Sequence, residues 1–226
     1  MPPAIDQADL VLIVDTCSVL DIARSAWRHE SPSADVGAVR RLKDAAEDPA
    51  RLDLAVCDVT VGEFNNHIDD VEIDGRASLA NLRKRVARAD EVAAHLGEAR
   101  LAKTTIGWVE PILKAAVALA REFVERAAII EASDDDTNRA YRRATAGRAP
   151  GRRGSHNMFD CVIAECAVRV ASLRPAGSTY LLTSNSKDFG GENGERLHPN
   201  LEIEFGNAGL VFTTTWSEVA GRIGLG

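Results

Sequence analysis

The stretch "LVLIVDTCSVLDI", residues 10–22, decides how the rest of the chain is interpreted. The five apolar residues 10–14 predict a short strand that is buried on both faces. The run ends on Asp15, and the small polar residues 16–18 follow before a helical apolar pattern resumes. A carboxylate at the carboxyl tip of a buried strand either caps the next helix or holds something that requires negative charge.

Similar apolar runs recur along the chain and alternate with helical patterns. Strands are predicted at 10–15, 52–58, 178–184 and 209–215, with an added edge strand at 201–205, and helices at 17–28, 35–46 and 158–172. Strands separated by helices predict an α/β fold, with a mainly parallel central sheet flanked by helices. The Ala-, Arg-, Leu- and Glu-rich stretch 77–145 predicts two or three helices. We interpret it as a helical arm inserted into a single domain that spans 1–226.

Composition limits the class of protein. The chain has 226 residues, a net charge of -7 and 45 % hydrophobic residues, which suits a globular domain and argues against a protein that coats nucleic acid along its whole surface. No leader-like segment and no apolar run long enough for a membrane span is apparent. The four cysteines form no CxxC pair and have apolar neighbours, which predicts reduced thiols in a cytoplasmic protein: Cys17, Cys57, Cys161 and Cys166.

Oxygen-bearing side chains follow the predicted strands. Asp15 ends the first strand, Glu63 lies in the helix after the second, and Asp160 opens the helix before the third. Asn185 and Asp188 follow the third strand, in "TSNSKDFG". Ligands of open α/β sheets bind beyond the carboxyl ends of the strands, so these groups are expected to converge. Mg²⁺ or Mn²⁺ would remove the repulsion between clustered carboxylates, because these ions prefer oxygen ligands.

Each acid also has a purely structural interpretation. Thr60 and Glu63 have the spacing of a capping box, and the segment 157–160 fits a helix start with an acid in its first turn. Asp15 has the position of a plain N-cap, and Asp188 precedes two glycines as an Asx-turn residue would. Taken one by one, these interpretations are at least as good as metal binding. The matching positions of all the acids favour a shared site.

Taken in order, the motifs resemble those of PIN-domain nucleases. The pattern consists of "VLIVDTCSVLDI", "VTVGEF", "FDCVIAECA" and the Thr-led turn "LLTSNSKDF". The resemblance implies a ribonuclease that hydrolyses RNA phosphodiester bonds with Mg²⁺ or Mn²⁺. It implies Asp15, Glu63 and Asp160 as catalytic metal ligands, joined by Asn185 and Asp188. Hydrogen bonds from Thr16, Ser18 and Ser184 would support the ligands.

The chain departs from the family pattern in two places. Asn185 stands where many members have a fourth acid, and the arm 77–145 has no full counterpart in compact members. A non-catalytic PIN-like binding or scaffold protein is therefore one alternative. A haloacid-dehalogenase-like phosphatase is another, because it too begins with a strand that ends on Asp. That class requires a second acid two residues later, where this chain has Cys17.

Positive charge is concentrated just before Asp160. The segment from Asn138 to Phe159 contains six arginines and no acid. Within the predicted loop 144–156, Arg148, Arg152 and Arg153 are candidates for steering an RNA backbone toward the metal. The alternative is an exposed loop whose arginines do nothing specific. The partners compatible with the resemblance are an RNA substrate, a second copy of the chain in a homodimer, and an antitoxin-like inhibitor protein, with no membrane involved.

Overall fold

The computed structural model describes residues 8–28, 33–97, 109–152, 157–191 and 197–225. Its centre is a five-stranded sheet in which every neighbouring pair of strands is parallel, in the order β3-β2-β1-β4-β5. The strands are β1 (Leu10–Val14), β2 (Leu52–Cys57), β3 (Ala128–Ile130), β4 (Thr179–Leu182) and β5 (Leu210–Thr213). The expected mainly parallel sheet is confirmed.

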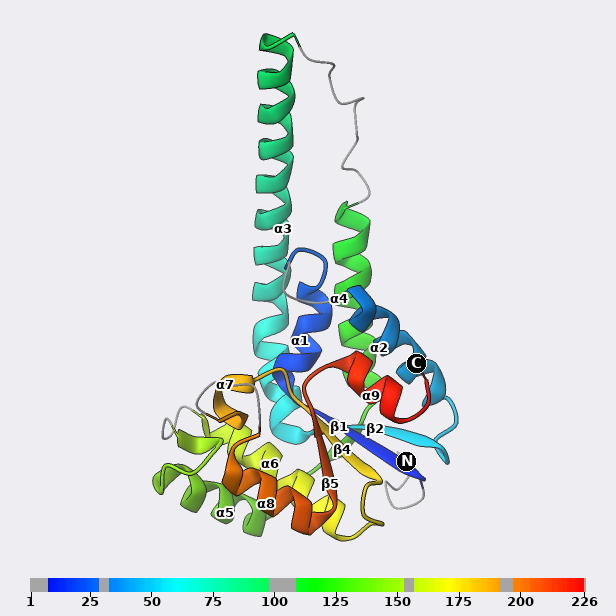
Figure 1. Ribbon diagram of the computed structural model, residues 1–226, viewed down its shortest axis with the longest axis vertical. Coiled ribbons are helices and arrows are strands. Elements are labelled where there is room, and N and C mark those ends of the chain that lie inside the picture. The colour runs from blue at the N-terminus through cyan, green and yellow to red at the C-terminus, as the bar shows by residue number, and fades with distance from the viewer. Residues whose placement is uncertain (1–7, 29–32, 98–108, 153–156, 192–196, 226) are drawn as a thin grey trace.

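Helices cover both faces of the sheet (Figure 1). They are α1 (Thr16–Arg24), α2 (Ser33–Ala45), α3 (Asp58–His95), α4 (Val109–Arg126), α5 (Asp134–Thr145), α6 (Met158–Ser172), α7 (Ser186–Phe189), α8 (Pro199–Ala208) and α9 (Trp216–Arg222). Helices α1, α2, α3, α4 and α9 form one core with the alternate β1 residues Leu12 and Val14. Helices α5, α6 and α8 form the second core with Val11 and Ile13. Because β1 is buried on both sides, it reads as a continuous apolar run.

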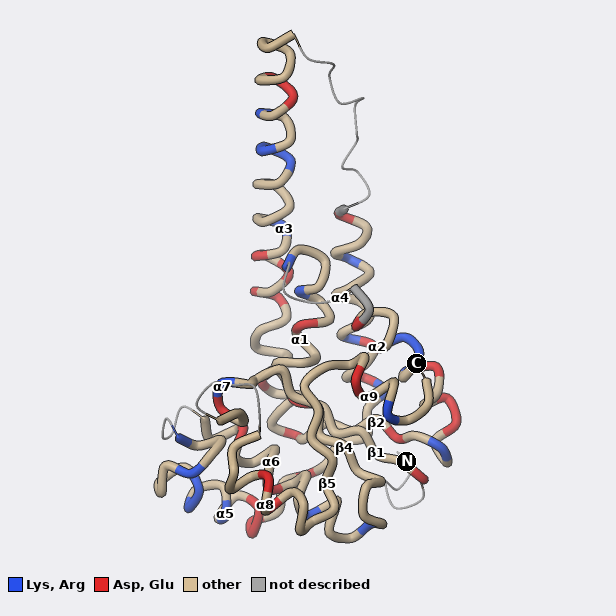
Figure 2. Tube along the Cα trace, in the orientation of Figure 1, with Lys and Arg blue, Asp and Glu red and all other residues tan. Residues whose placement is uncertain are grey.

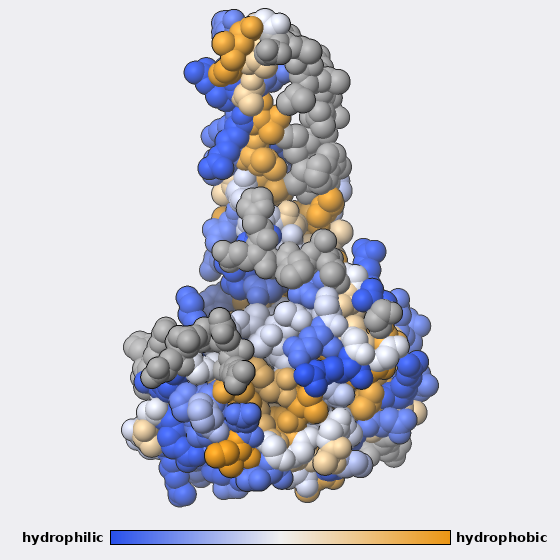
Figure 3. Space-filling model, viewed as in Figure 1, coloured by the Kyte–Doolittle hydropathy of each residue, from blue (hydrophilic) through white to orange (hydrophobic). Residues whose placement is uncertain are grey.

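The long helix α3 leaves the body of the molecule halfway along its length (Figure 1). Its buried residues end at Leu79, and its outer part carries interspersed basic and acidic residues (Figure 2). Some apolar side chains are exposed there, including Leu82 at 44 % and Val92 at 42 % (Figure 3). The projecting arm is thus the second half of a helix that starts at Asp58.

Two details of the predicted element order were wrong. The range 77–145 holds the edge strand β3 as well as helices, and α5 packs against α6 in the body. The division of 1–226 into one domain with an insertion at 77–145 stays a prediction. Residues 201–205 belong to α8 rather than to an edge strand. Among the described helices, none is both long and apolar enough to cross a bilayer.

The two glycines of α3 provide a matched test of its packing. A Cβ at Gly75 would lie 2.7 Å from the Trp27 ring and 2.8 Å from Leu113, whereas a Cβ at Gly62 would meet nothing within 4 Å. We expect Gly75→Ala to destabilise the protein by about 1–3 kcal/mol through overpacking. Gly62→Ala should stabilise it by about 0.5–1 kcal/mol through helix propensity. Urea denaturation of both variants measures the difference, and equal effects would contradict the packing of α3 against Trp27.

Candidate active site

The predicted acids lie at the point where the strand order reverses. Strands β2 and β3 lie on one side of β1, and β4 and β5 lie on the other. The strand order therefore reverses between β1 and β4, which is the topological switch point of the sheet. Open α/β sheets bind ligands beyond the carboxyl ends of the strands at such a point. Asp15 follows β1 there, and Thr183 and Asn185 follow β4.

The Asp15 side chain links the carboxyl ends of β1 and β4 through a hydrogen bond. Its side chain is 1 % exposed, and Thr183 Oγ1 donates a 2.6 Å hydrogen bond to Asp15 Oδ2. The backbone amide of Asn185 donates to the same threonine oxygen at 3.0 Å. Asp15 is the N-cap residue of α1, but its side chain makes no capping hydrogen bond, so the plain N-cap interpretation fails. The carboxylate is instead held at the strand tip, where its second oxygen can face a ligand.

Ser18 and Ser184 fasten α1 to the end of β4. The Ser184 amide donates to Ser18 Oγ at 2.8 Å, and Ser184 Oγ donates to Asp21 Oδ2 at 2.7 Å. Both serines therefore support the backbone that carries Asp15 and Asn185, as expected for groups that position metal ligands. Thr16 is also buried, and within the part of the chain that the structure describes its hydroxyl oxygen has no hydrogen-bond partner.

Asp160 lies in the first turn of α6 and is held by two amides. Asn157 Nδ2 and Asn185 Nδ2 donate to Asp160 Oδ2 at 3.2 Å and 3.0 Å. The N-cap residue Asn157 makes no capping bond of its own, because its side chain is committed to the acid. Asn185 thus orients Asp160 through its nitrogen, which leaves its carbonyl oxygen as the atom that could act as a neutral ligand.

Glu63 is freed by the position where α3 begins. The helix starts at Asp58, so Thr60 lies inside it and the expected capping box with Glu63 does not form. Asp58 Oδ1 accepts from the Val59 amide at the helix start instead. The Glu63 carboxylate is half-buried and raises the pKa of both Asp15 and Asp160 by its charge. The third acid therefore shares the field of the other two.

Burial and mutual repulsion set the protonation of the cluster. Burial is the main reason that the pKa of Asp15 is raised to about 6. The hydrogen bond from Thr183 lowers this pKa, and the charge on Glu63 raises it further. Burial, followed by the charge on Asp15, raises the pKa of Asp160 to about 8, and buried Asp188 in α7 contributes to the same rise. The main influences on these two pKa values, among the described residues, include no lysine or arginine. The cluster has an excess of negative charge.

The donor set fits a hard divalent cation in its chemistry. Mg²⁺ and Mn²⁺ prefer oxygen ligands, and every group here offers oxygen. The groups are the carboxylates of Asp15, Glu63 and Asp160, the side-chain carbonyl of Asn185 and the buried hydroxyl of Thr16. Among the described residues, no three His, Cys, Asp or Glu side chains are already arranged as a metal cage. The cluster is an acidic site whose oxygen atoms would supply ligands to such a cation.

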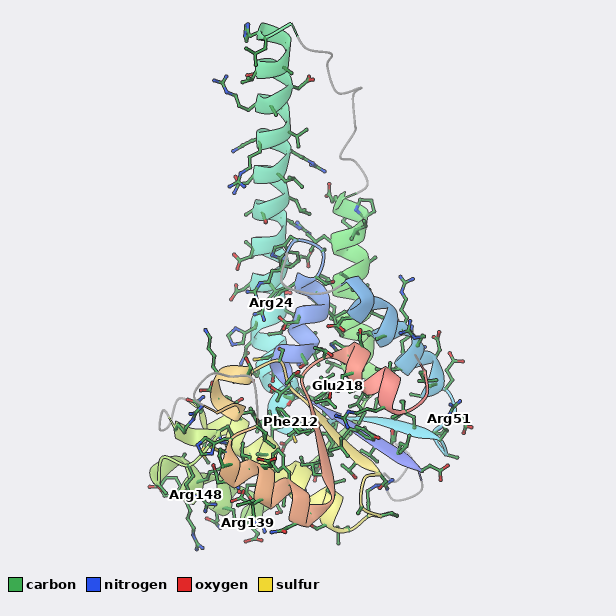
Figure 4. The ribbon with its side chains drawn as sticks, viewed as in Figure 1. Arg24, Arg51, Arg139, Arg148, Phe212 and Glu218 are labelled. Atoms are coloured by element: carbon green, nitrogen blue, oxygen red, sulfur yellow. The ribbon has the colours of Figure 1, made fainter. Side chains whose placement is uncertain are left out.

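Two of the predicted RNA-binding arginines, Arg148 and Arg152, are described and make different contacts. Arg148 forms an ion pair with Glu204 on α8, on the side of the sheet where α5 and α8 lie (Figure 4). Arg152 donates to the carbonyl oxygens of Lys187 and Gly190 at 2.7 Å and so holds α7 beside the site. Arg153 lies outside the described residues. Of the two arginines that the structure describes, Arg152 contacts the turn that carries Asn185 and Asp188.

Sequence reasoning missed two contributors to the site. Asp21 accepts from Ser184, and its charge raises the pKa of Asp15. Asn157 was interpreted only as part of a helix start, yet it holds Asp160. The helical spacing of Asp21 three residues after Ser18 is a signal that could have placed it on the face of α1 nearest the site.

Comparison with protein families agrees with this geometry. The family model described as PIN domain matches residues 12–189, a span that contains every acid of the cluster. The chain belongs to the PIN-domain family, whose members are generally nucleases. Searches against curated proteins and against solved structures gave no significant match.

The raised pKa values predict how stability depends on pH. An acid whose pKa is higher in the folded chain keeps its proton there after the unfolded chain has lost it. Its stabilising effect is therefore complete below the usual value of 3.8 and is lost as the pH rises through about 6 for Asp15 and about 8 for Asp160. In chelator, we expect the free energy of unfolding to fall by on the order of 5 kcal/mol between pH 5 and pH 8.5.

Thermal unfolding checks this prediction. The Tm in chelator should fall by roughly 10–20 °C over that pH range. At pH 8.5, Mn²⁺ at 100 times its Kd should restore about 2.7 kcal/mol. Asp160→Asn should show a flatter pH dependence, because the neutral amide carries no charge to repel. A Tm that rises with pH in the wild type would contradict the assigned electrostatics.

Proposed function

We propose that the protein is a metal-dependent endoribonuclease that hydrolyses RNA phosphodiester bonds at the Asp15–Glu63–Asp160 cluster. The observation that carries the proposal is that these three acids act on one another at the strand tips, where burial and the charges of neighbouring acids raise the pKa values of Asp15 and Asp160. An enzyme that keeps such a repulsive group needs a ligand of opposite charge.

Each residue has a definite task in this proposal. Asp15 and Asp160 would hold Mg²⁺ or Mn²⁺, with Glu63, the Asn185 carbonyl and Asp188 completing the oxygen donors. A bound cation supplies an acidified water and stabilises charge on the phosphate. The hydrogen bond from Thr183 would hold the Asp15 carboxylate at the strand tip, and the hydrogen bonds from Asn157 and Asn185 would orient the Asp160 carboxylate. Glu63 would hold the same ion through a water molecule or orient the attacking water.

RNA would approach over the α7 turn. Arg152 fixes that turn through two carbonyl oxygens, and Arg153 follows it directly in sequence. We propose Arg152 and Arg153 as candidates for steering the RNA phosphates, because they adjoin this turn in space or in sequence, whereas Arg148 pairs with Glu204 on α8. An antitoxin-like inhibitor protein or a second copy would be further partners. The free thiols described for the four cysteines suit a reducing compartment such as the cytoplasm.

A substrate panel tests the proposal. Labelled single-stranded RNA, single-stranded DNA and a generic phosphomonoester are incubated with the protein in Mg²⁺, in Mn²⁺ and in chelator. We expect internal RNA cuts that require either cation. Phosphomonoester hydrolysis without RNA cleavage would favour the phosphatase alternative. Cation binding by calorimetry without hydrolysis of any substrate would favour a binding or scaffold protein.

A further inference from the structure

A small pocket adjoins the acidic site on the other side of α1. Its volume is about 130 Å³, and it lies between α1, α2 and the segment that joins β5 to α9. Ser18 and Ser184, which fasten the site, also line this pocket. The indole nitrogen of Trp216, at its base, donates to the Ser18 carbonyl oxygen at 3.3 Å. The pocket and the acidic site therefore share a wall.

The pocket lies at the edge of the sheet where the acids lie. Ser184 and Thr214 follow the carboxyl ends of β4 and β5. Three of the pocket-lining residues come from α1 and its C-cap, namely Ser18, Ile22 and Ser25, and they have helical spacing. Ser18 is about 5 Å from Asp15 along the helix axis at 1.5 Å per residue. A strand whose phosphate lies at Asp15 could therefore place a neighbouring base in the pocket.

The size and walls of the pocket suit one flat aromatic ring. Ile22, Val36, Val39 and Trp216 supply apolar surface. A cavity of roughly 150 Å³ in another protein admits benzene, so a solvent-open pocket of this size has room for one ring of a nucleobase but not for a whole nucleotide. Single-stranded RNA is commonly read in this way, by unstacked bases that insert between apolar side chains.

Asp35 supplies a hydrogen-bond acceptor at the pocket. Its Oδ1 accepts from the amide and the hydroxyl of Ser217, at 3.0 Å and 2.6 Å. Its Oδ2 has no partner among the described residues, and no lysine or arginine of that part of the chain pairs with it. The other pocket acid, Asp21, is already bound by Ser184 and Arg24. A carboxylate can only accept, so the base edge that faces Asp35 must donate.

We propose that this pocket binds one nucleobase of the RNA next to the cleaved phosphate and selects bases with an exocyclic amino group. Adenine, cytosine and guanine can donate an amino hydrogen to Asp35 Oδ2, as bases do to carboxylates elsewhere. Uracil has its N3–H as its one donor on this edge, and the carbonyl oxygens on either side of it would repel the carboxylate. The role in cleavage rests on the proposed ribonuclease function, whereas base binding can be measured without it.

Nucleoside binding is measured by NMR titration in chelator, which removes any contribution of the cation. We expect adenosine, cytidine and guanosine to shift the amide signals of Val36 and Ser217 at concentrations at least fivefold lower than uridine. Asp35→Asn keeps an oxygen for Ser217 and should abolish the preference over uridine. Val36→Trp should fill the pocket and remove binding of all four nucleosides. Val92→Trp, at an exposed position of α3, is the matched control and should bind like the wild type.

Mapping of cleavage positions on an RNA that contains every trinucleotide gives the second readout. Wild type should cut preferentially beside amino-bearing bases, and Asp35→Asn should lose that preference. Equal binding of all four nucleosides, or binding unaffected by Val36→Trp, overturns the pocket assignment. RNA cleavage with an unchanged pattern in Asp35→Asn overturns it while leaving the ribonuclease proposal intact. Selective binding without any RNA cleavage supports the pocket and counts against the ribonuclease function alone.

Discussion

Asp160→Asn is expected to lower the rate of RNA cleavage in Mn²⁺ by about 10³-fold while the protein stays folded. The amide keeps an oxygen that can accept from Asn157 and Asn185, so the local hydrogen bonds survive. It loses the negative charge that a divalent cation requires. The same loss removes repulsion with Asp15, so the variant should be more stable than the wild type in chelator at pH 8.5.

Opposite changes in activity and stability distinguish a lost ligand from a damaged fold. The rate is measured on labelled RNA, and the Tm is measured on the same preparation. Asp70→Asn is the matched control, because it removes an exposed acid of α3 and should leave both quantities unchanged. If Asp160→Asn cuts RNA as well as the wild type, the acidic cluster is not the site of cleavage.

Arg143→Met is expected to destabilise the protein by about 3–5 kcal/mol, because it leaves buried Glu165 with the more distant and exposed Arg139, at 3.6 Å, as its remaining ion-pair partner among the described residues. Arg143 is 6 % exposed and Glu165 is 5 % exposed. The guanidinium donates twice to Glu165 Oε1, at 2.6 Å and 2.8 Å, and once to the Ala149 carbonyl oxygen at 2.9 Å. A second pair with Glu204 at 2.5 Å joins α5 to α8.

Urea denaturation gives the size of the effect. Arg142→Met, one residue earlier and exposed, should change the free energy of unfolding by less than about 0.5 kcal/mol. The double variant Arg143→Met/Glu165→Met should recover most of the loss, since a buried pair replaced by apolar side chains is often neutral. An additive double variant would show that the Arg143–Glu165 pair is not energetically coupled.

Much of the site could be predicted from local pattern. Apolar runs ended by polar residues located four of the five strands, and the order of Asp15, Glu63, Asp160 and Asn185 indicated the family that the comparison then showed. These features depend on neighbours within a few residues, because a parallel strand buried on both faces must be continuously apolar and its tip must face the ligand edge.

Short segments could not be assigned from local pattern. In 201–205 the alternation of apolar and acidic residues indicates a strand, but Leu201 and Phe205 are both buried, four residues apart, on one face of α8. Pro199 in the first turn and Gly209 at φ 70° mark the two ends of that helix. The three residues of β3 carry too little periodicity to stand out from the helices around them, and pairing with β2 alone makes them a strand.

The sequence by itself determined which acids form the candidate site, because acids at strand tips can be read from the chain. Only the tertiary structure decided what those side chains meet. It placed Thr183 against Asp15 and Asn157 against Asp160, and it turned the arginine-rich segment partly inward, where Arg143 pairs with Glu165. These partners are separated by 168, 3 and 22 residues, and the two distant pairs depend on the order of strands and the packing of helices. Charge patterns in a sequence do not record which opposite charge a folded chain brings near.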